Sequence, residues 1–286
     1  MVVRVVTGLV LAPLVIWLVL FSPQWAGLLF FGLIAWLGTD ELLRMWPENG
    51  RLGRLLGCFG AALVAVWPAI DATTLLAIFA LVPVLLLAAS LLDADDLDVA
   101  VKRATSSVLA IGYVGLMCAT LVAIWQLDGP IVPAGAPQPA AAGIGLGSYT
   151  FGRGAVMFLL VAVFCGDTGA YFTGRTLGRH KLFAAVSPKK TVEGAIGGLV
   201  ASTFGGWAAA LVVLPALGHV EALAIGGLCG LVGQIGDLTE SLFKRAHNTK
   251  DSGRLLPGHG GVLDRLDGVL FAAPVLYAWL VLLRVG

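Results

Sequence analysis

The chain has 286 residues, of which 58% are hydrophobic and 12% are charged, and its mean hydropathy is +0.94. Soluble globular domains carry about 25% charged residues, so this composition excludes an ordinary soluble fold and predicts an integral membrane protein. The formal net charge of +1 gives no indication of a nucleic-acid partner.

Apolar runs close to the roughly 20 residues that cross a bilayer recur along the chain. The first is predicted to be a retained helix, because it exceeds a signal-peptide core and no small-residue cleavage site ends it. We therefore expect an all-α polytopic membrane protein with about nine transmembrane helices. The runs lie at about 5–22, 25–45, 52–70, 73–92, 104–125, 154–173, 194–214, 219–238 and 267–284.

The distribution of Lys and Arg predicts the orientation of these helices. With nine spans, the N-terminus and the even-numbered loops share one side of the membrane, and 16 of the 18 Lys and Arg residues fall there. Only Arg153 and Arg284 fall on the other side. By the positive-inside rule, the N-terminus is cytoplasmic and the C-terminus is outside.

We divide the chain into three regions. Residues 1–125 form five spans with few motifs, 126–153 form an outer loop rich in Pro, Ala and Gly, and 154–286 form four spans. The last region has cytoplasmic loops at 174–193 and 239–266, which carry most of the polar motifs. Each of the four cysteines falls inside a predicted helix without a CxxC pair, which indicates core residues rather than disulfides or a zinc site.

The first polar cluster lies at the end of the sixth span. Asp167, Tyr171 and Arg175 are four residues apart and share one helix face. An ionisable group in a span usually lines a cavity or pairs with a partner. Asp167 is therefore either a cavity residue or a structural partner of Arg175 or Arg179.

The second cluster is SPKKTVEGAIGG at 187–198. Lys189 and Lys190 precede a helix that Thr191 is expected to cap, with Gly194 allowing close packing. Two cations and a helix N-terminus suit a phosphate group. The alternative is a lysine pair that only sets topology or contacts lipid headgroups.

The third cluster is SLFKRAHNTKDSGRLLPGHGGVLDRLD at 241–267, which contains five cations, three carboxylates and two histidines. A polar stripe that includes Gln234, Asp237, Ser241 and Lys244 leaves the eighth span on one side of a helix. The Gly-rich turn that follows could hold an anion with backbone amides. Oxygen donors with no nearby Cys favour Mg²⁺, with Asp237, Asp264 and Asp267 as the candidate ligands. The alternative is a structural salt-bridge network.

These residues resemble a known family signature. The string Ser241-x-x-Lys244-Arg245-x4-Lys250-Asp251-x-Gly253-x3-Pro257-x-His259-Gly260-Gly261-x2-Asp264-Arg265-x-Asp267 is similar to that of the phosphatidate cytidylyltransferases, which make CDP-diacylglycerol. The segments DTGAYFTGR, SPKKTVEG and GDLTES resemble the family in the same order. The resemblance is specific over about 164–270 and elsewhere extends only to the hydrophobic pattern.

The resemblance implies that CTP and phosphatidate react to give CDP-diacylglycerol and pyrophosphate, with Mg²⁺ and a second cation such as K⁺. It also implies a bacterial plasma (inner) membrane location, an active site on the cytoplasmic side and a homodimer. The candidate catalytic residues are Lys244, Arg245, Lys250, Asp251, His259 and Arg265. The candidate substrate-binding residues are Lys189, Lys190, Ser241, Gly260, Gly261, Asp167 and Tyr171.

Two other functions would also require charged residues in a membrane protein. A transporter should place polar residues near the bilayer midplane in both halves, whereas this chain keeps them at one face of one half. A CTP-dependent lipid kinase, or a cytidylyltransferase for another lipid, would use the same cationic loops with a different acceptor. Only the lipid product distinguishes these enzymes.

Overall fold

The computed structural model describes residues 2–92, 96–128, 149–215, 217–253, 255, 258 and 260–283. These residues are almost entirely helical, which confirms the all-α membrane class. The chain forms two compact units, each made of segments that are distant in sequence. Unit 1 contains Met1–Leu18, Ser22–Ala123 and Phe243–Leu266, and unit 2 contains Val19–Phe21, Ile124–Leu242 and Asp267–Gly286.

Unit 1 is built on the N-terminal helices. Its core contains Ala61 and Val64 of α3, Val82 and Leu86 of α4, and Ile111 at the start of η3. Small and β-branched residues let these helices approach closely, as is usual for helices in lipid. The elements are α1 (Val2–Leu20), α2 (Gln24–Arg44), α3 (Arg51–Val66), η1 (Trp67–Ala69), η2 (Ala72–Thr74), α4 (Leu75–Leu92), α5 (Leu97–Ala110), the π-helical η3 (Ile111–Leu116) and α6 (Met117–Trp125).

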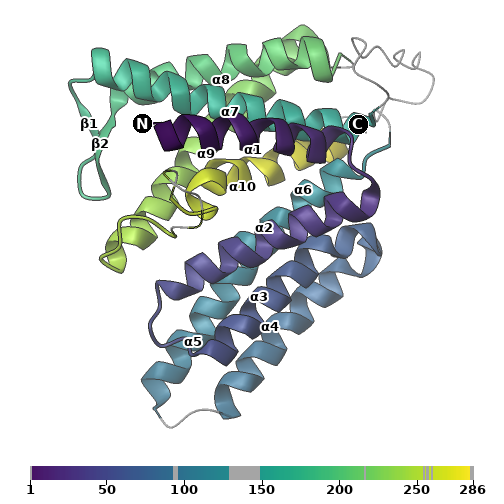
Figure 1. Ribbon diagram of the computed structural model, residues 1–286, viewed down its shortest axis with the longest axis vertical. Coiled ribbons are helices and arrows are strands. Elements are labelled where there is room, and N and C mark those ends of the chain that lie inside the picture. The colour runs from purple at the N-terminus through teal and green to yellow at the C-terminus, as the bar shows by residue number, and fades with distance from the viewer. Residues whose placement is uncertain are drawn as a thin grey trace. The chain divides into compact units, whose positions relative to one another are not determined.

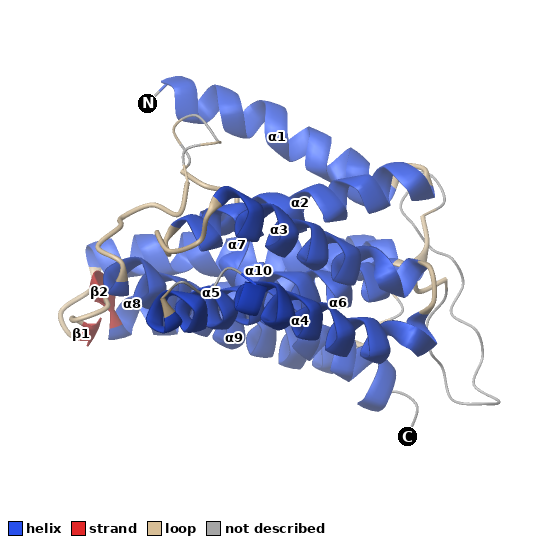
Figure 2. Cartoon of the chain, turned by 90° about the horizontal axis from the view of Figure 1, so that it is seen from below, coloured by secondary structure: helices blue, strands red, loops and turns tan. Residues whose placement is uncertain are grey.

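Unit 2 is built on a hairpin of two long helices, α7 (Phe151–Thr176) and α8 (Val192–Val213), which lie side by side (Figure 1). Strands β1 (Lys181–Phe183) and β2 (Ser187–Thr191) connect them and pair antiparallel, Lys181 opposite Thr191 and Phe183 opposite Ser187. Figure 2, in which strands are red, shows this small sheet at the ends of α7 and α8. It is a local exception to the all-α prediction.

Glycines set the spacing of the helices in unit 2. A Cβ atom on Gly169 of α7 would overlap the Ala201 side chain of α8, and one on Gly230 would overlap Ser202. Gly230 belongs to α9 (His219–Ala246), which is followed by α10 (Leu263–Ala278) and the π-helical η4 (Trp279–Leu283). Both α9 and α10 have residues in each unit.

Six helices of the described chain are long and apolar enough to cross a membrane. Shorter apolar helices cover Thr7–Leu20 and Leu75–Ala89. The predicted count of nine spans and the orientation of the termini stay predictions. The six candidates are Gln24–Arg44, Arg51–Ala69, Leu97–Trp125, Phe151–Thr176, Val192–Val213 and His219–Ala246.

Several predicted loops differ from the structure in extent. The predicted loop 239–266 begins inside α9, which continues to Ala246, and ends inside α10, which begins at Leu263. The predicted loop 174–193 contains the β1–β2 sheet. Most of the predicted outer loop 126–153 (residues 129–148) lies outside the described residues.

Candidate active site

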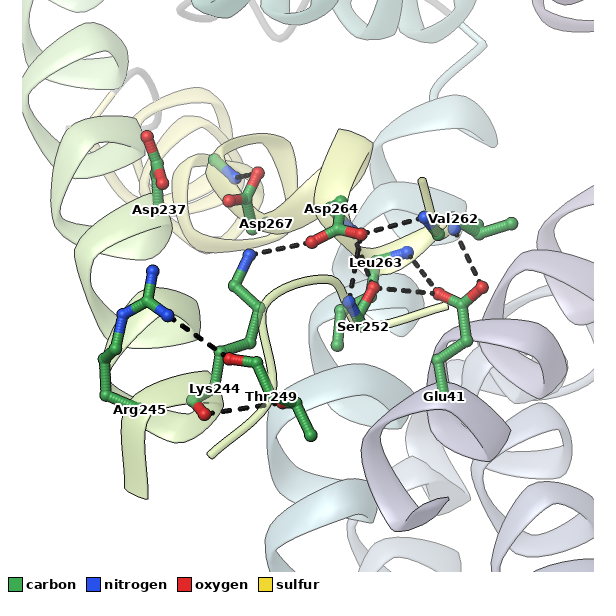
Figure 3. Close-up of polar contacts among 12 residues, drawn as sticks. Glu41, Asp237, Lys244, Arg245, Thr249, Ser252, Val262, Leu263, Asp264 and Asp267 are labelled. Atoms are coloured by element: carbon green, nitrogen blue, oxygen red, sulfur yellow. Dashed lines mark hydrogen bonds and ion pairs between the residues drawn. The ribbon is translucent and has the colours of Figure 1, made fainter. Parts of the chain in front are cut away.

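In unit 1, Lys244 and Asp264 form a buried ion pair (Figure 3). Lys244 lies in the last turn of α9 and Asp264 in the first turn of α10. The Lys244 Nζ atom is 2.7 Å from Oδ1 of Asp264, and the two side chains are only 11% and 9% exposed. Because both charges leave water, removing either partner would strand the other. The pair therefore ties the end of α9 to the start of α10.

The second oxygen of Asp264 organises the loop between these helices. Oδ2 accepts hydrogen bonds from the backbone N–H groups of Ser252, at 3.0 Å, and Gly261, at 2.8 Å. Burial alone would raise the pKa of Asp264, but hydrogen bonds from Lys244 and Gly261 outweigh it and hold the pKa below its usual value. Asp264 is therefore an anion. Its contacts with Lys244, Ser252 and Gly261 hold the loop between α9 and α10, which we call the signature loop.

Four other described, charged signature residues belong to unit 1. Arg245, Lys250, Asp251 and Arg265 are exposed, so the three cations among them can reach a dissolved anionic ligand. The guanidinium of Arg245 donates to the carbonyl of Thr249 at 3.4 Å, and His259 lies outside the described residues.

The Gly-rich turn needs its glycines. Gly260 has a φ of +85°, which favours glycine, and a Cβ atom there would lie 2.8 Å from Oδ2 of Asp264. Gly261 is buried, and its N–H already donates to Asp264. The N–H of Gly261 therefore serves the loop itself, rather than a bound anion.

In unit 2, Lys190 of β2 forms an ion pair with Asp237 of α9, with Nζ 2.6 Å from Oδ2. Successive residues of a strand face opposite sides, so Lys189 points away from this pair and is exposed. The sequence analysis predicted the same phosphate-binding role for both lysines, but their positions on the strand give them different surroundings. Of these two lysines, it is Lys190 that is paired with a predicted metal ligand.

Thr191 and Glu193 hold the sheet that carries these lysines. The Thr191 hydroxyl accepts the N–H of Gly194 at 3.1 Å, which confirms the predicted helix cap. Glu193 accepts the backbone N–H groups of Arg179, at 3.0 Å, and His180, at 3.2 Å. The turn before β1 is thereby fixed to the start of α8.

Asp267 is the most enclosed carboxylate of the predicted metal set. It is 8% exposed, accepts the N–H of Gly268 at 2.8 Å, and interacts electrostatically with Asp237, Glu240 and Asp167. Burying like charges together is unfavourable without a cation. Among the described residues, however, no three His, Cys, Asp or Glu side chains converge closely enough to enclose one metal ion.

Two further predicted residues lie on α7 and one on α9. The guanidinium of Arg175 donates to the Tyr171 hydroxyl at 2.8 Å, and Tyr171 is 57% exposed. Asp167 is also exposed, whereas Ser241 of α9 is buried. Arg175 therefore contacts a residue on the predicted helix face, and that residue is Tyr171.

The sequence profile of the cytidylyltransferase family matches residues 2–283, almost the whole chain. The chain belongs to the cytidylyltransferase family. Curated relatives carry the name phosphatidate cytidylyltransferase. The protein from Brucella suis biovar 1 (strain 1330) is 45% identical over 177 residues, 60% of this chain and 65% of that protein. The protein from Bacillus subtilis (strain 168) is 42% identical over 132 residues, 46% of this chain and 49% of that protein.

These matches cover less than two thirds of each of these relatives. The match to a cytidylyltransferase family over nearly the full chain agrees with the resemblance found in the signature. The roles of the individual site residues stay predictions.

One buried carboxylate that contacts the start of α10 was not predicted from the sequence. Glu41 of α2 is 5% exposed and accepts hydrogen bonds from Val262 and Leu263 at the start of α10. Its only sequence signal is a carboxylate inside an apolar run. That signal says nothing of a partner more than 200 residues away.

Proposed function

We propose that the chain transfers the CMP group of CTP to phosphatidate, giving CDP-diacylglycerol and pyrophosphate. Membership of the cytidylyltransferase family carries this proposal. The curated name of the relatives in Brucella suis and Bacillus subtilis supplies the lipid acceptor. In this reaction, a phosphate oxygen of phosphatidate attacks the α-phosphorus of CTP. The bond from that phosphorus to the oxygen bridging to the β-phosphate breaks, and pyrophosphate leaves.

The attacking phosphate is already an anion at neutral pH, so no residue needs to remove a proton from it. Catalysis then depends on positioning and on neutralising the charge of the triphosphate and the lipid phosphate. We assign that neutralisation to five cations, of which Lys190 and Lys244 are also paired with carboxylates. The other three, Lys189, Arg245 and Lys250, are exposed. His259 is a candidate hydrogen-bond donor to phosphate, not a general base.

We propose Mg²⁺ as the cofactor, with K⁺ as a candidate second cation. Asp267 is buried with Asp237, Glu240 and Asp167 as charged neighbours, and their oxygen atoms are the ligand type that Mg²⁺ prefers, although among the described residues no three such side chains are arranged to enclose one ion. Asp237, Asp264 and Asp267 are the candidate ligands for one or two metal ions. A bound Mg²⁺ would neutralise phosphate charge and polarise the α-phosphate. The lysines paired with Asp237 and Asp264 already compensate part of the carboxylate charge.

We place the protein in a bacterial inner membrane with nine spans, a cytoplasmic N-terminus and the signature loops on the cytoplasmic side. The bias of 16 of 18 Lys and Arg residues supports this orientation. Phosphatidate would then enter from the bilayer, and CTP from the cytoplasm. A homodimer is proposed on the family resemblance alone, and nucleic acid is not among the proposed partners.

The decisive experiment identifies the lipid product. Purified protein is incubated with Mg²⁺, CTP labelled at its α-phosphate or its γ-phosphate, and either phosphatidate or diacylglycerol. We expect the α-label, but not the γ-label, to enter a lipid that forms only from phosphatidate. Transfer of the γ-label to diacylglycerol would instead indicate a CTP-dependent lipid kinase. No labelled lipid from either acceptor would contradict both functions.

A further inference from the structure

Glu41 is a buried carboxylate that none of the sequence motifs includes. It lies in the last turns of α2, within unit 1, and its exposed fraction is 5%. Its Oε1 accepts the N–H of Val262 at 3.0 Å, and its Oε2 accepts the N–H of Leu263 at 2.9 Å. A buried carboxylate is costly unless donors surround it, so both oxygens are committed to this contact.

The same carboxylate reaches the middle of the signature loop. The Ser252 hydroxyl donates to Oε2 of Glu41 at 3.2 Å and accepts the N–H of Asp264 at 3.3 Å (Figure 3). Asp264 in turn accepts the Lys244 ammonium. A continuous hydrogen-bonded path therefore runs from Glu41 through Ser252 and Asp264 to Lys244.

Two glycines of the signature are explained by this carboxylate. A Cβ atom on Gly253 would overlap the carboxylate of Glu41, and one on Gly261 would overlap both Glu41 and the Ser252 hydroxyl. Neither glycine has a φ in the left-handed region, so backbone conformation does not require them. The loop lacks side chains at these positions because it is wrapped closely around Glu41.

We propose that Glu41 is a positioning residue for the transfer reaction, acting through Ser252 and Asp264 on Lys244. The inference rests on the proposed function. Glu41 contacts Ser252 near one end of the loop and Val262 and Leu263 at the other, so the Lys244–Asp264 pair is held in place before substrate arrives. Such preorganisation matters most in the transition state, where small displacements of a catalytic group are costly.

The test compares Glu41→Gln with Asp40→Asn in purified full-length protein. Gln has a similar shape, but its NH₂ group must face a backbone N–H, so one hydrogen bond is replaced by a repulsion. Asp40 is the neighbouring carboxylate, paired with Arg44 at the surface of α2. We expect kcat of Glu41→Gln to fall about a hundredfold with a KM for phosphatidate within about threefold of wild type. Asp40→Asn should retain wild-type kinetics.

The kinetic constants separate positioning from simple stability. A purely structural role would reduce the yield and the unfolding temperature, but leave kcat per folded molecule unchanged. We also expect the effects of Glu41→Gln and Ser252→Ala on kcat to be non-additive, because both variants interrupt one path. Unchanged kcat in folded Glu41→Gln, or fully additive effects, would overturn the inference.

A second variant covers the case in which Glu41→Gln does not fold. Gly253→Ala keeps the Glu41 carboxylate and displaces it, whereas Gly112→Ala adds a Cβ atom to open space in η3. We expect kcat to fall for Gly253→Ala alone, and equal kcat in the two variants would overturn the inference. If wild-type protein makes no CDP-diacylglycerol, the proposed function itself fails. Wild-type synthesis with unaffected variants contradicts only the role of Glu41.

Discussion

The Lys244 ammonium lies 2.7 Å from the Asp264 carboxylate, and neither side chain is more than 11% exposed. Both residues were predicted from the sequence as site residues, Lys244 as catalytic and Asp264 as a metal ligand, but the ion pair between them was not predicted. The pair gives Asp264 a structural task in addition to its proposed metal-binding task. The effect of a substitution at Asp264 must therefore be measured on both the free energy of unfolding and turnover.

Asp264→Asn should lower both the free energy of unfolding and turnover. The variant removes the ion-pair partner of the buried Lys244, which we expect to reduce the free energy of unfolding by roughly 3 kcal/mol. It also removes a proposed metal ligand, so turnover of the folded fraction should fall by about two orders of magnitude. Denaturation in detergent and turnover at saturating Mg²⁺ and CTP measure the two effects.

Asp40→Asn is the matched control for stability. It breaks the more exposed pair with Arg44, whose partners are four residues apart on α2, and should cost less than about 1 kcal/mol. If Asp264→Asn keeps near-wild-type turnover, Asp264 is neither a metal ligand nor a catalytic residue.

The lysines of β2 should differ from one another in stability. Lys190→Gln leaves Asp237 without its ion-pair partner, whereas Lys189→Gln changes an exposed side chain. We expect only Lys190→Gln to lower the unfolding temperature measurably. Equal effects would mean that the ion pair contributes nothing to stability.

The double variant Lys189→Gln/Lys190→Gln tests phosphate binding. Two charge-assisted contacts are lost, and we expect correct insertion with turnover reduced by about a hundredfold or more. The remaining cytoplasmic cations should preserve topology, as impermeant labelling can verify. Full specific activity in correctly inserted protein would leave the lysines with a topological role only.

The predicted orientation can be tested by cysteine labelling. Ala246→Cys, at the exposed end of α9, should react with a membrane-impermeant thiol reagent only from the cytoplasmic side. Gly218→Cys lies in the predicted outer loop between the seventh and eighth spans and should react only from outside. The reagent can reach this position, because it is exposed and a Cβ atom there meets open space. The wild-type cysteines provide the background. Labelling of both positions from one face would show that the spans between them are miscounted.

Glycine substitutions test the close packing of unit 2. Gly230→Ala places a Cβ atom against the Ser202 side chain of α8, and overpacking of this kind should cost about 1–3 kcal/mol. Gly112→Ala meets no atom within 4 Å and should be neutral, or stabilising by about 0.5–1 kcal/mol because alanine favours helix. Thermal unfolding in detergent compares them. Equal unfolding temperatures would mean that α8 and α9 can separate at little cost.

The sequence predicted the features that depend on local composition and spacing. Apolar runs predicted a helical membrane protein because unpaired backbone groups cannot be tolerated in lipid. Thr191 was identified as a helix cap because capping involves residues only three apart. The cytidylyltransferase signature was recognisable because its residues lie within one short stretch of chain.

The tertiary structure decided which charges meet. The pairing of Lys190 with Asp237 depends on how β2 lies against α9, and strand alternation then separates Lys190 from Lys189. Glu41 contacts Leu263 across 222 positions of sequence, a separation that no periodicity encodes. Sequence determines the residue types and their local spacing, whereas contacts between distant segments follow from how the helices pack.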